Sequence, residues 1–199
     1  PCIYSGEDEY DEARYVVEQI NHLKREEFYK YQDFTILYRM NAQSRAIEDI
    51  LMREQVPYKV VGGLKFYERK EIKDTIAYLR LIHNTADNLS LRRIINEPKR
   101  GIGKTSLDKI QDISDREGIS MYEIIKNAQN YYLTRVATNA KEFVEQIESL
   151  RAKKNELKIS DLIKEALNVT GYTKALELEN TIEAQTRIEN IEEFLTVAI

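Results

Sequence analysis

The chain has 199 residues, 42% of them hydrophobic and 32% charged, which suits one large or two small folded domains with a buried core. Its net charge of −4 argues against a histone-like protein that holds DNA by overall charge, although a local basic patch remains possible. The single cysteine, Cys2, excludes a disulfide framework, and His22 and His83 lack metal-ligand spacing. No apolar run approaches the roughly 18 residues of a membrane span and no signal peptide opens the chain, so we expect a soluble cytoplasmic protein. Because the first residue is Pro1, we also expect an excised piece of a longer polypeptide.

The first third of the sequence alternates between strand-like and helix-like segments. Three apolar runs favour short strands: 1–4, 34–38 and 57–61. Helical spacing of apolar residues covers the two segments between them, 7–28 and 42–55. The order β-α-β-α-β predicts an α/β fragment, an incomplete parallel sheet flanked by helices, over residues 1–66.

From residue 67 onward the strand signals stop and helical spacing continues to the end. We expect helices over 71–83, 89–96, 104–118, 138–154, 160–170 and 182–199, and one more that begins at Ser120. Ser120 and Glu123 form a capping-box pattern, and Gly171 is a predicted C-cap. The last helix carries an apolar stripe that needs a partner: Ile188, Ile191, Leu195 and Ala198. Residues 67–199 therefore read as a mainly α-helical domain.

A glycine turn within this helical part is the strongest local signal. It comprises Arg100, Gly101, Ile102, Gly103, Lys104 and Thr105. It is not a nucleotide P-loop, because Pro98 stands where that motif needs a glycine and a helix-like segment precedes it. A helix, a Gly-Ile-Gly turn and a second helix instead suit a helix-hairpin-helix contact, in which free amides bind a DNA phosphate. The six bases and two acids between residues 91 and 109 support this reading, whereas a plain interhelical corner with solvated charges is the alternative.

A second signal follows the apolar run 34–38, at the end of a predicted parallel strand, where open α/β sheets bind ligands. Arg39 supplies a forked cation for a phosphate, and Asn41 supplies a donor and an acceptor for a base or sugar. The alternative is that Asn41 caps the next helix and that Arg39 or Arg45 forms a surface ion pair.

The boundary between the two parts reads as a hinge rather than as a catalytic site. Its candidate residues are Gly62, Gly63, Phe66, Arg69 and Glu71. Two glycines followed by packed aromatic residues suit a hinge, and Arg69 with Glu68 or Glu71 is expected to fix domain orientation. We find no Ser-His-Asp set and no positioned nucleophile, so no catalytic residue and no metal site is predicted in this chain.

Four strings together resemble the PcrA/UvrD/Rep family of superfamily 1 DNA helicases, most closely its PcrA type. They are ILYRMNAQSR, VPYKVVGGLKFYERKEIKDTIAYLRL, INEPKRGIGKTSLDKI and QTRIENIEEFL, which occur in the family's order. In that family two RecA-like motor domains sandwich ATP, and each carries an inserted accessory domain. The resemblance implies that residues 1–66 are the first part of the second motor domain (2A), with an incomplete RecA-like sheet. Residues 67–199 then form most of its inserted accessory domain (2B).

The same resemblance implies a role in an ATP-dependent 3′ to 5′ helicase of replication or repair. Arg39 and Asn41 would contact single-stranded DNA, and the turn 100–105 would contact duplex phosphates. The family's ATP-site residues lie outside this sequence, so ATP and Mg²⁺ are expected only in the full-length parent, with no cofactor here. Expected partners are single-stranded and junction DNA, the other motor domains, and repair or transcription proteins, in the bacterial cytoplasm and without a membrane. The alternatives are a non-enzymatic helix-hairpin-helix DNA-binding module and a helical protein-interaction domain.

Overall fold

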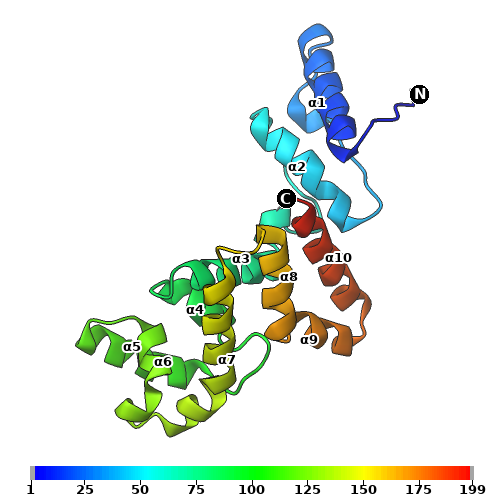
Figure 1. Cartoon of the computed structure of the whole chain (residues 1–199). Coiled ribbons are helices and arrows are strands. Elements are labelled where there is room, and N and C mark those ends of the chain that lie inside the picture. Colours follow the sequence, from blue (N-terminus) through cyan, green and yellow to red (C-terminus); the bar gives the residue numbers. More distant parts are fainter. Residues whose placement is uncertain (1–2, 198–199) are drawn as a thin grey trace. The chain divides into compact units, whose positions relative to one another are not determined.

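The computed structural model describes residues 3–197, and the chain divides into two compact units, Pro1–Arg69 and Lys70–Ile199 (Figure 1). This division lies close to the composition change expected after residue 66. Within the described residues, all regular secondary structure is helical.

The first unit is built on two helices, α1 (Glu9–Glu26) and α2 (Ser44–Arg53). The carboxylate of Asp8 begins α1 by accepting a 2.7 Å hydrogen bond from the Asp11 amide, as an N-cap does. The apolar faces of both helices meet in a small core made of Ala13, Val17, Ala46, Ile50, Leu51 and Val56. The two helices predicted for this part of the sequence are therefore confirmed, with ends that differ by about two residues.

The expected parallel sheet is absent from the described residues, so the α/β fold class predicted from the sequence is wrong. Segments 34–38 and 57–61 are not assigned as strands. Of the expected strand at 1–4, residues 3 and 4 are irregular and the first two lie outside the described part. An apolar run gives only strand propensity, because a strand also needs a neighbour that completes its hydrogen-bond ladder. Leu37 and Val61 are 89% and 88% exposed, which an inner parallel strand does not allow.

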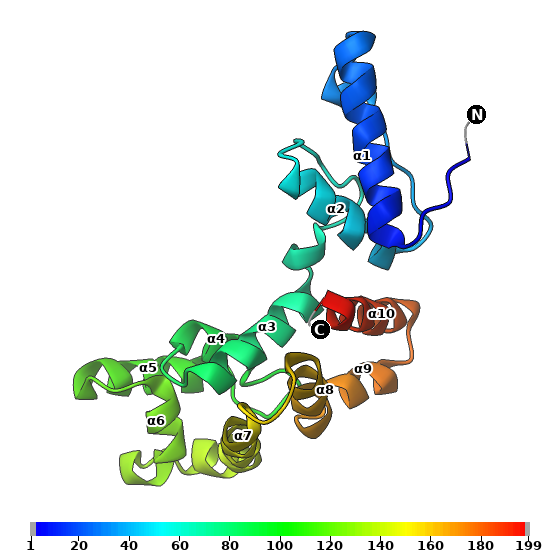
Figure 2. The same ribbon diagram turned by 45° about the horizontal axis from the view of Figure 1, so that its top comes forward.

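The second unit is a helical assembly. Its helices are α3 (Lys70–His83), α4 (Asn88–Ile94), α5 (Lys104–Glu117), α6 (Met121–Lys126), α7 (Thr134–Lys153), α8 (Ile159–Val169), α9 (Tyr172–Glu179) and α10 (Ile182–Val197). Helix α3 packs against α4, α7, α8 and α10. In both ribbon views α5 and α6 lie at one end of this unit and α9 and α10 at the other (Figures 1 and 2). Tyr78, Tyr122 and Phe143 are among the large side chains buried in its core.

Most of the helices predicted for the second part are confirmed, with two differences. Helix α7 begins at Thr134, four residues before the expected start at 138, and α9 was not predicted. The apolar stripe of α10 has partners in the same unit: Ile191 is buried, and Ile188 and Leu195 pack against the core, while Ala198 lies outside the described residues.

One expected helix cap is confirmed: Ser120 caps α6 by accepting a hydrogen bond from the Glu123 amide. The C-cap of α8 is Thr170 and not the expected Gly171, which follows it in the left-handed region with φ 74°.

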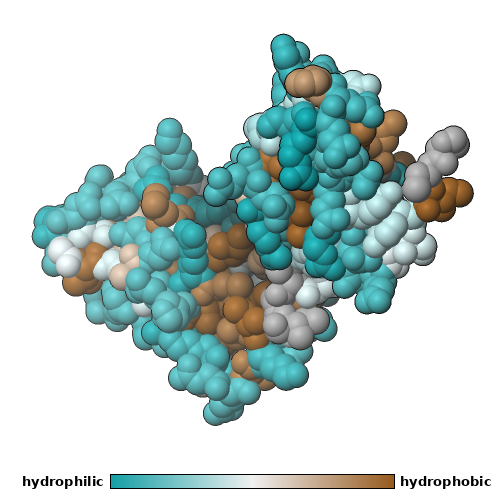
Figure 3. Space-filling view, turned by 90° about the horizontal axis from the view of Figure 1, so that it is seen from above, coloured by the Kyte–Doolittle hydropathy of each residue, from teal (hydrophilic) through white to brown (hydrophobic). Residues whose placement is uncertain are grey.

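The molecular face shown in Figure 3 is mostly hydrophilic, with apolar side chains gathered in smaller areas. Among the residues that the structure describes, no helix is both long enough and apolar enough to cross a bilayer.

Candidate nucleic-acid interface

The turn between α4 and α5 presents backbone amides that no protein group occupies. Gly103 precedes α5 in an extended conformation, and its carbonyl accepts from the amides of Ser106 and Leu107 at 3.0 and 3.1 Å. No acceptor for the amides of Gly103, Lys104 and Thr105 exists among the described residues. All three of these residues are exposed. The start of α5 is therefore a geometrically suitable site for a phosphate or another anion.

The two glycines of the turn have different roles. Gly101 adopts φ 72°, and a Cβ there would lie 2.8 Å from Nδ2 of Asn139. Gly103 has φ −88°, and a Cβ there would meet no atom within 4 Å. Between them Ile102 is only 1% exposed and fixes the turn to the core. Gly101 is thus needed for the conformation, whereas the open side of Gly103 allows a ligand to approach.

Arg100 points into the protein, so the structure does not support the sequence-based expectation that its side chain contacts DNA. Its guanidinium donates to the carbonyls of residues 94, 95 and 98 at 3.2 Å each and to that of Thr170 at 3.1 Å. It also donates to the hydroxyl of Tyr78 at 3.3 Å and lies over the ring of Phe143. These contacts make Arg100 a support of the turn.

Among the described residues, the arginines of the basic patch have side-chain partners and its lysines have none. Arg92 pairs with Asp108 at 3.2 Å, and Arg93 pairs with the buried Asp74 at 2.7 Å. The three lysines of the patch are exposed and form no ion pair within the described part of the chain: Lys99, Lys104 and Lys109. The unpaired positive charge near the turn is therefore smaller than the sequence count suggested, but it includes Lys104, which also carries one of the open amides.

Arg39 and Asn41 lie on the surface of the first unit. The backbone amide of Arg39 donates to Oε1 of Gln43 at 3.1 Å, while its guanidinium has no partner among the described residues. Asn41 opens a short 3₁₀ turn, and the N-cap position of α2 belongs to Gln43. The alternative reading of Asn41 as the N-cap of this helix is therefore not supported. Neither side chain has a hydrogen-bond or ion-pair partner in the part of the chain that the structure describes, so both could contact a ligand.

Arg45 is buried, whereas Arg39 is exposed. It is 1% exposed and pairs with Asp49 at 3.4 Å and with Glu9 at 3.6 Å. It also donates to the hydroxyl of Tyr10, above whose ring it lies. Arg45 is therefore an internal support of the α1–α2 pair and not a surface ion-pair partner.

The candidate hinge residues of the first unit are anchored to α2. The amide of Phe66, whose side chain is fully buried, donates to both carboxylate oxygens of Glu48 at 3.2 Å. Arg69 donates to the Ser44 hydroxyl at 2.8 Å and lies over the Phe66 ring. Upstream, Gly62 has φ 79° and would meet no atom within 4 Å through a Cβ, whereas a Cβ on Gly63 would lie 3.7 Å from Cγ1 of Val60, an ordinary contact. Sequence reasoning missed Glu48, whose burial in a helix of mixed composition gives no local signal.

In the second unit, Glu71 and Asp74 are buried carboxylates of α3 with structural partners. Glu71 accepts a 2.6 Å hydrogen bond from Nδ2 of Asn190 in α10. Asp74 accepts from Tyr172 at 2.8 Å and pairs with Lys70 at 3.0 Å. Burial and the nearby Asp74 raise the pKa of the Tyr172 hydroxyl, which therefore stays protonated as a donor. These acids hold helices together and are not poised for proton transfer.

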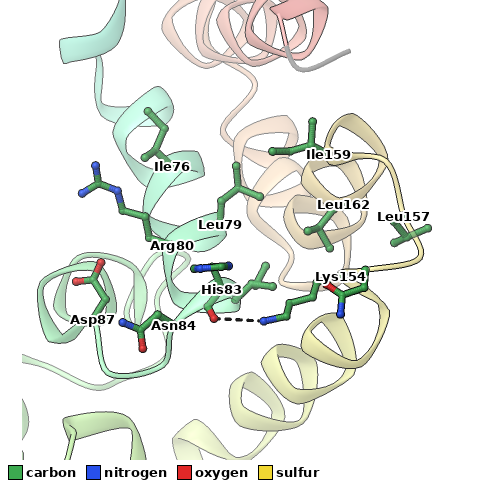
Figure 4. A pocket seen from close by; sticks show the side chains of 12 residues that line it. Ile76, Leu79, Arg80, His83, Asn84, Asp87, Lys154, Leu157, Ile159 and Leu162 are labelled. Carbon is green, nitrogen blue, oxygen red and sulfur yellow. Dashed lines mark hydrogen bonds between the residues drawn. The ribbon is translucent and has the colours of Figure 1, made fainter.

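Two cavities, one in each unit, have linings without a catalytic set. One, of about 640 Å³, lies in the second unit between α3 and the α7–α8 connection (Figure 4). Its floor is apolar, with Leu79 and Leu162, and Lys154 donates across it to the His83 carbonyl at 3.4 Å. The other, of about 900 Å³, lies in the first unit beside segments 34–38 and 56–61. Over the described residues, no group of three or more His, Cys, Asp or Glu side chains is placed to hold a metal ion.

Comparison with known proteins gives a consistent result over the whole chain. A family model described as the UvrD-like helicase C-terminal domain matches residues 1–199. Proteins named ATP-dependent DNA helicase PcrA are similar to the chain over 195 residues, or 98% of its length: 45% identical in Staphylococcus aureus (strain NCTC 8325 / PS 47) and 44% in Bacillus subtilis (strain 168). The chain spans 27% and 26% of these two relatives, about a quarter of their length.

Proposed function

The chain belongs to the UvrD-like helicase C-terminal domain family, and from that premise we propose that it is a piece of an ATP-dependent DNA helicase. The whole protein would use ATP and Mg²⁺ to move 3′ to 5′ along single-stranded DNA and unwind duplex DNA in replication or repair, in the bacterial cytoplasm. Residues 1–66 would belong to its second motor domain and residues 67–199 to the accessory domain inserted there. The partners would be DNA, the other motor domains and repair or transcription proteins.

The observation that carries the DNA-binding proposal is the open start of α5. Three unoccupied amides, at Gly103, Lys104 and Thr105, lie on the surface next to unpaired lysines. Backbone amides with nearby cations bind phosphate without reading the base sequence. The turn would therefore hold duplex DNA at a junction, with the Thr105 hydroxyl as a further donor and Arg100 and Ile102 as its internal supports.

We propose a second DNA contact at Arg39 and Asn41 in the first unit. A free guanidinium and a free carboxamide, two residues apart and both exposed, suit a phosphate and a base or sugar of one strand. The chain has no Walker A motif, so by itself it is expected not to hydrolyse ATP.

The hinge proposal rests on separate anchors at the two ends of segment 66–71. Phe66 and Arg69 are bound to α2, and Glu71 is bound to α10 through Asn190. We propose that domain movement in the helicase is concentrated at the junction of Arg69 and Lys70, between the last anchor to α2 and the anchor to α10, with Gly62 and Gly63 giving the preceding loop freedom. Such a role needs no catalytic group.

The duplex contact is tested with Lys104→Ala in the full-length helicase, with Lys164→Ala as the matched control. Both lysines are exposed and unpaired within the described part, but only Lys104 borders the turn. The slope of log affinity for duplex DNA against log salt is negative, and removing one phosphate contact should reduce its magnitude by about 0.9. An unchanged slope for Lys104→Ala, or an equal fall for Lys164→Ala, would contradict the proposal.

The single-strand contact is tested with Arg39→Ala in the same protein, with Arg53→Ala as the control because Arg53 is another exposed, unpaired arginine of the first unit. The salt slope for single-stranded DNA should fall by about 0.7 in Arg39→Ala only. If Arg39→Ala instead weakens nucleotide binding and leaves single-strand affinity unchanged, its phosphate ligand belongs to ATP and the proposal is wrong.

A further inference from the structure

The side chain of Asn96 is hydrogen-bonded to the inner side of the glycine turn. It lies two residues after the last residue of α4 and is half-buried. Its side-chain oxygen accepts two backbone hydrogen bonds, from the amide of Arg100 at 2.8 Å and from that of Ile102 at 3.3 Å. One carboxamide oxygen thus occupies two amides that precede the open ones, and no other acceptor in the described residues serves either amide.

A second asparagine holds the same turn from another helix. Nδ2 of Asn139 in α7 donates to the Gly101 carbonyl at 3.4 Å. The buried Ile102 side chain lies between these two contacts along the chain. The amides of Arg100 and Ile102 and the carbonyl of Gly101 are consequently satisfied by side chains. The amides of Gly101, Gly103, Lys104 and Thr105 have no acceptor among the described residues.

We propose that Asn96 is a positioning residue that pre-organises the turn so that the amides of Gly103, Lys104 and Thr105 converge on one phosphate. This inference rests on the proposed DNA-binding function of the turn. A site held in its binding geometry before the ligand arrives loses less conformational freedom on binding, which increases affinity. Asn96 would act without touching DNA, and its effect would therefore be transmitted through the amides of Arg100 and Ile102.

The test compares three variants of the full-length helicase: Asn96→Ala, Asn96→Asp and Gly103→Ala. The probe is a fluorescein-labelled duplex with a single-stranded tail, and hydrogen exchange of the Arg100 and Ile102 amides is measured in parallel. Asn96→Ala removes the acceptor, so both amides should exchange faster and affinity should fall roughly three- to tenfold, the effect of one net hydrogen bond. Asn96→Asp keeps an acceptor oxygen, so slow exchange and most of the affinity should return at 0.3 M salt, where about 6 Å of screening limits the added charge.

Gly103→Ala distinguishes the positioning role of Asn96 from the binding of phosphate by the turn itself. A methyl group there meets open space in the protein, so exchange of the two amides should stay slow while close approach of a phosphate is hindered. If Gly103→Ala weakens binding but Asn96→Ala binds like the parent, the positioning role is wrong and the phosphate site stands. If neither variant changes duplex affinity, the DNA-binding function of the turn itself is wrong. If Asn96→Asp keeps slow exchange but binds as weakly as Asn96→Ala, ordering of these amides is not what Asn96 contributes.

Discussion

The hydroxyl of Tyr172 donates a 2.8 Å hydrogen bond to the carboxylate of Asp74, which lies 98 residues earlier in the chain and is 1% exposed. This contact ties α9 to α3. The same carboxylate also forms ion pairs with Arg93 at 2.7 Å and with Lys70 at 3.0 Å, so two cations balance its negative charge. A buried carboxylate is tolerated in a helical core only when its oxygens are satisfied in this way.

The first prediction concerns this contact. Tyr172→Phe keeps the packing of the ring but leaves one acceptor site of the buried Asp74 without its donor. The free energy of unfolding of the 199-residue chain should fall by about 1.5–3 kcal/mol, the range for hydrogen bonds to charged groups. Urea unfolding followed by circular dichroism measures it. Tyr132→Phe is the control, because the Tyr132 side chain is 94% exposed, and an equal loss in both variants would contradict the assignment.

Helix α9 is an example of a helix that is too short to be predicted from the spacing of its apolar residues. It has eight residues and buries only Tyr172 and Leu176, too few positions to form a periodic signal. By contrast α1, with Ala13, Val17 and Ile20 on one buried face, was predicted correctly because its pattern extends over several turns. The strand at 34–38 was predicted wrongly because short apolar runs do not specify a partner, and no ladder forms in the described residues.

The second prediction separates Arg100 from the lysines of the patch. Arg100→Lys keeps the charge but cannot reach the carbonyls of residues 94, 95, 98 and 170 with one ammonium group. Stability should fall by about 1.5–3 kcal/mol in urea unfolding, whereas Lys99→Ala, at an exposed neighbour, should change it by less than about 0.5 kcal/mol.

Arg100→Gln removes the charge, and under conditions where it is folded its salt slope for duplex binding should equal that of the parent. A fall like that expected for Lys104→Ala would show that Arg100 contacts DNA after all.

Part of the candidate site could be predicted from the sequence. The Gly-Ile-Gly turn and its position before a helix follow from local rules, because turn glycines and helix starts act over a few residues. The inward direction of Arg100 depends on Thr170 in a distant helix, and no local pattern encodes that contact. Asn96 was missed for a related reason, since an asparagine after a helix is an ordinary turn residue until its acceptors and donors are seen.

The third prediction concerns acid stability. Hydrogen bonds from the amide and hydroxyl of Ser90 lower the pKa of Asp87, which caps α4. A carboxyl group with a lowered pKa stabilises the fold above its unfolded value of about 3.9 and loses that contribution as the pH falls through the folded value. Asp87→Ala should therefore cost about 1 kcal/mol at pH 7 and progressively less below about pH 4.

Thermal or urea unfolding across this pH range measures the difference. Asp112→Ala is the matched control, because Asp112 is exposed and has no hydrogen-bond partner within the described chain. A cost for Asp87→Ala that is independent of pH would show that the charged form of the cap is not what stabilises α4.

The last prediction uses the two glycines of the turn as an internal comparison of stability. Gly101→Ala places a Cβ at φ 72°, which costs about 1–2 kcal/mol for an L-residue, and brings it 2.8 Å from Nδ2 of Asn139. Gly103→Ala is unstrained at φ −88°. There, the gain of about 0.4–1 kcal/mol from a stiffer unfolded chain is offset by the poorer N-cap. Urea unfolding should therefore show a loss of at least about 1 kcal/mol for Gly101→Ala and a change below about 0.5 kcal/mol for Gly103→Ala. Because Asn139→Ala removes the crowded side chain, it should lessen the cost of Gly101→Ala in the double variant, and strictly additive effects would contradict the close approach of these two residues.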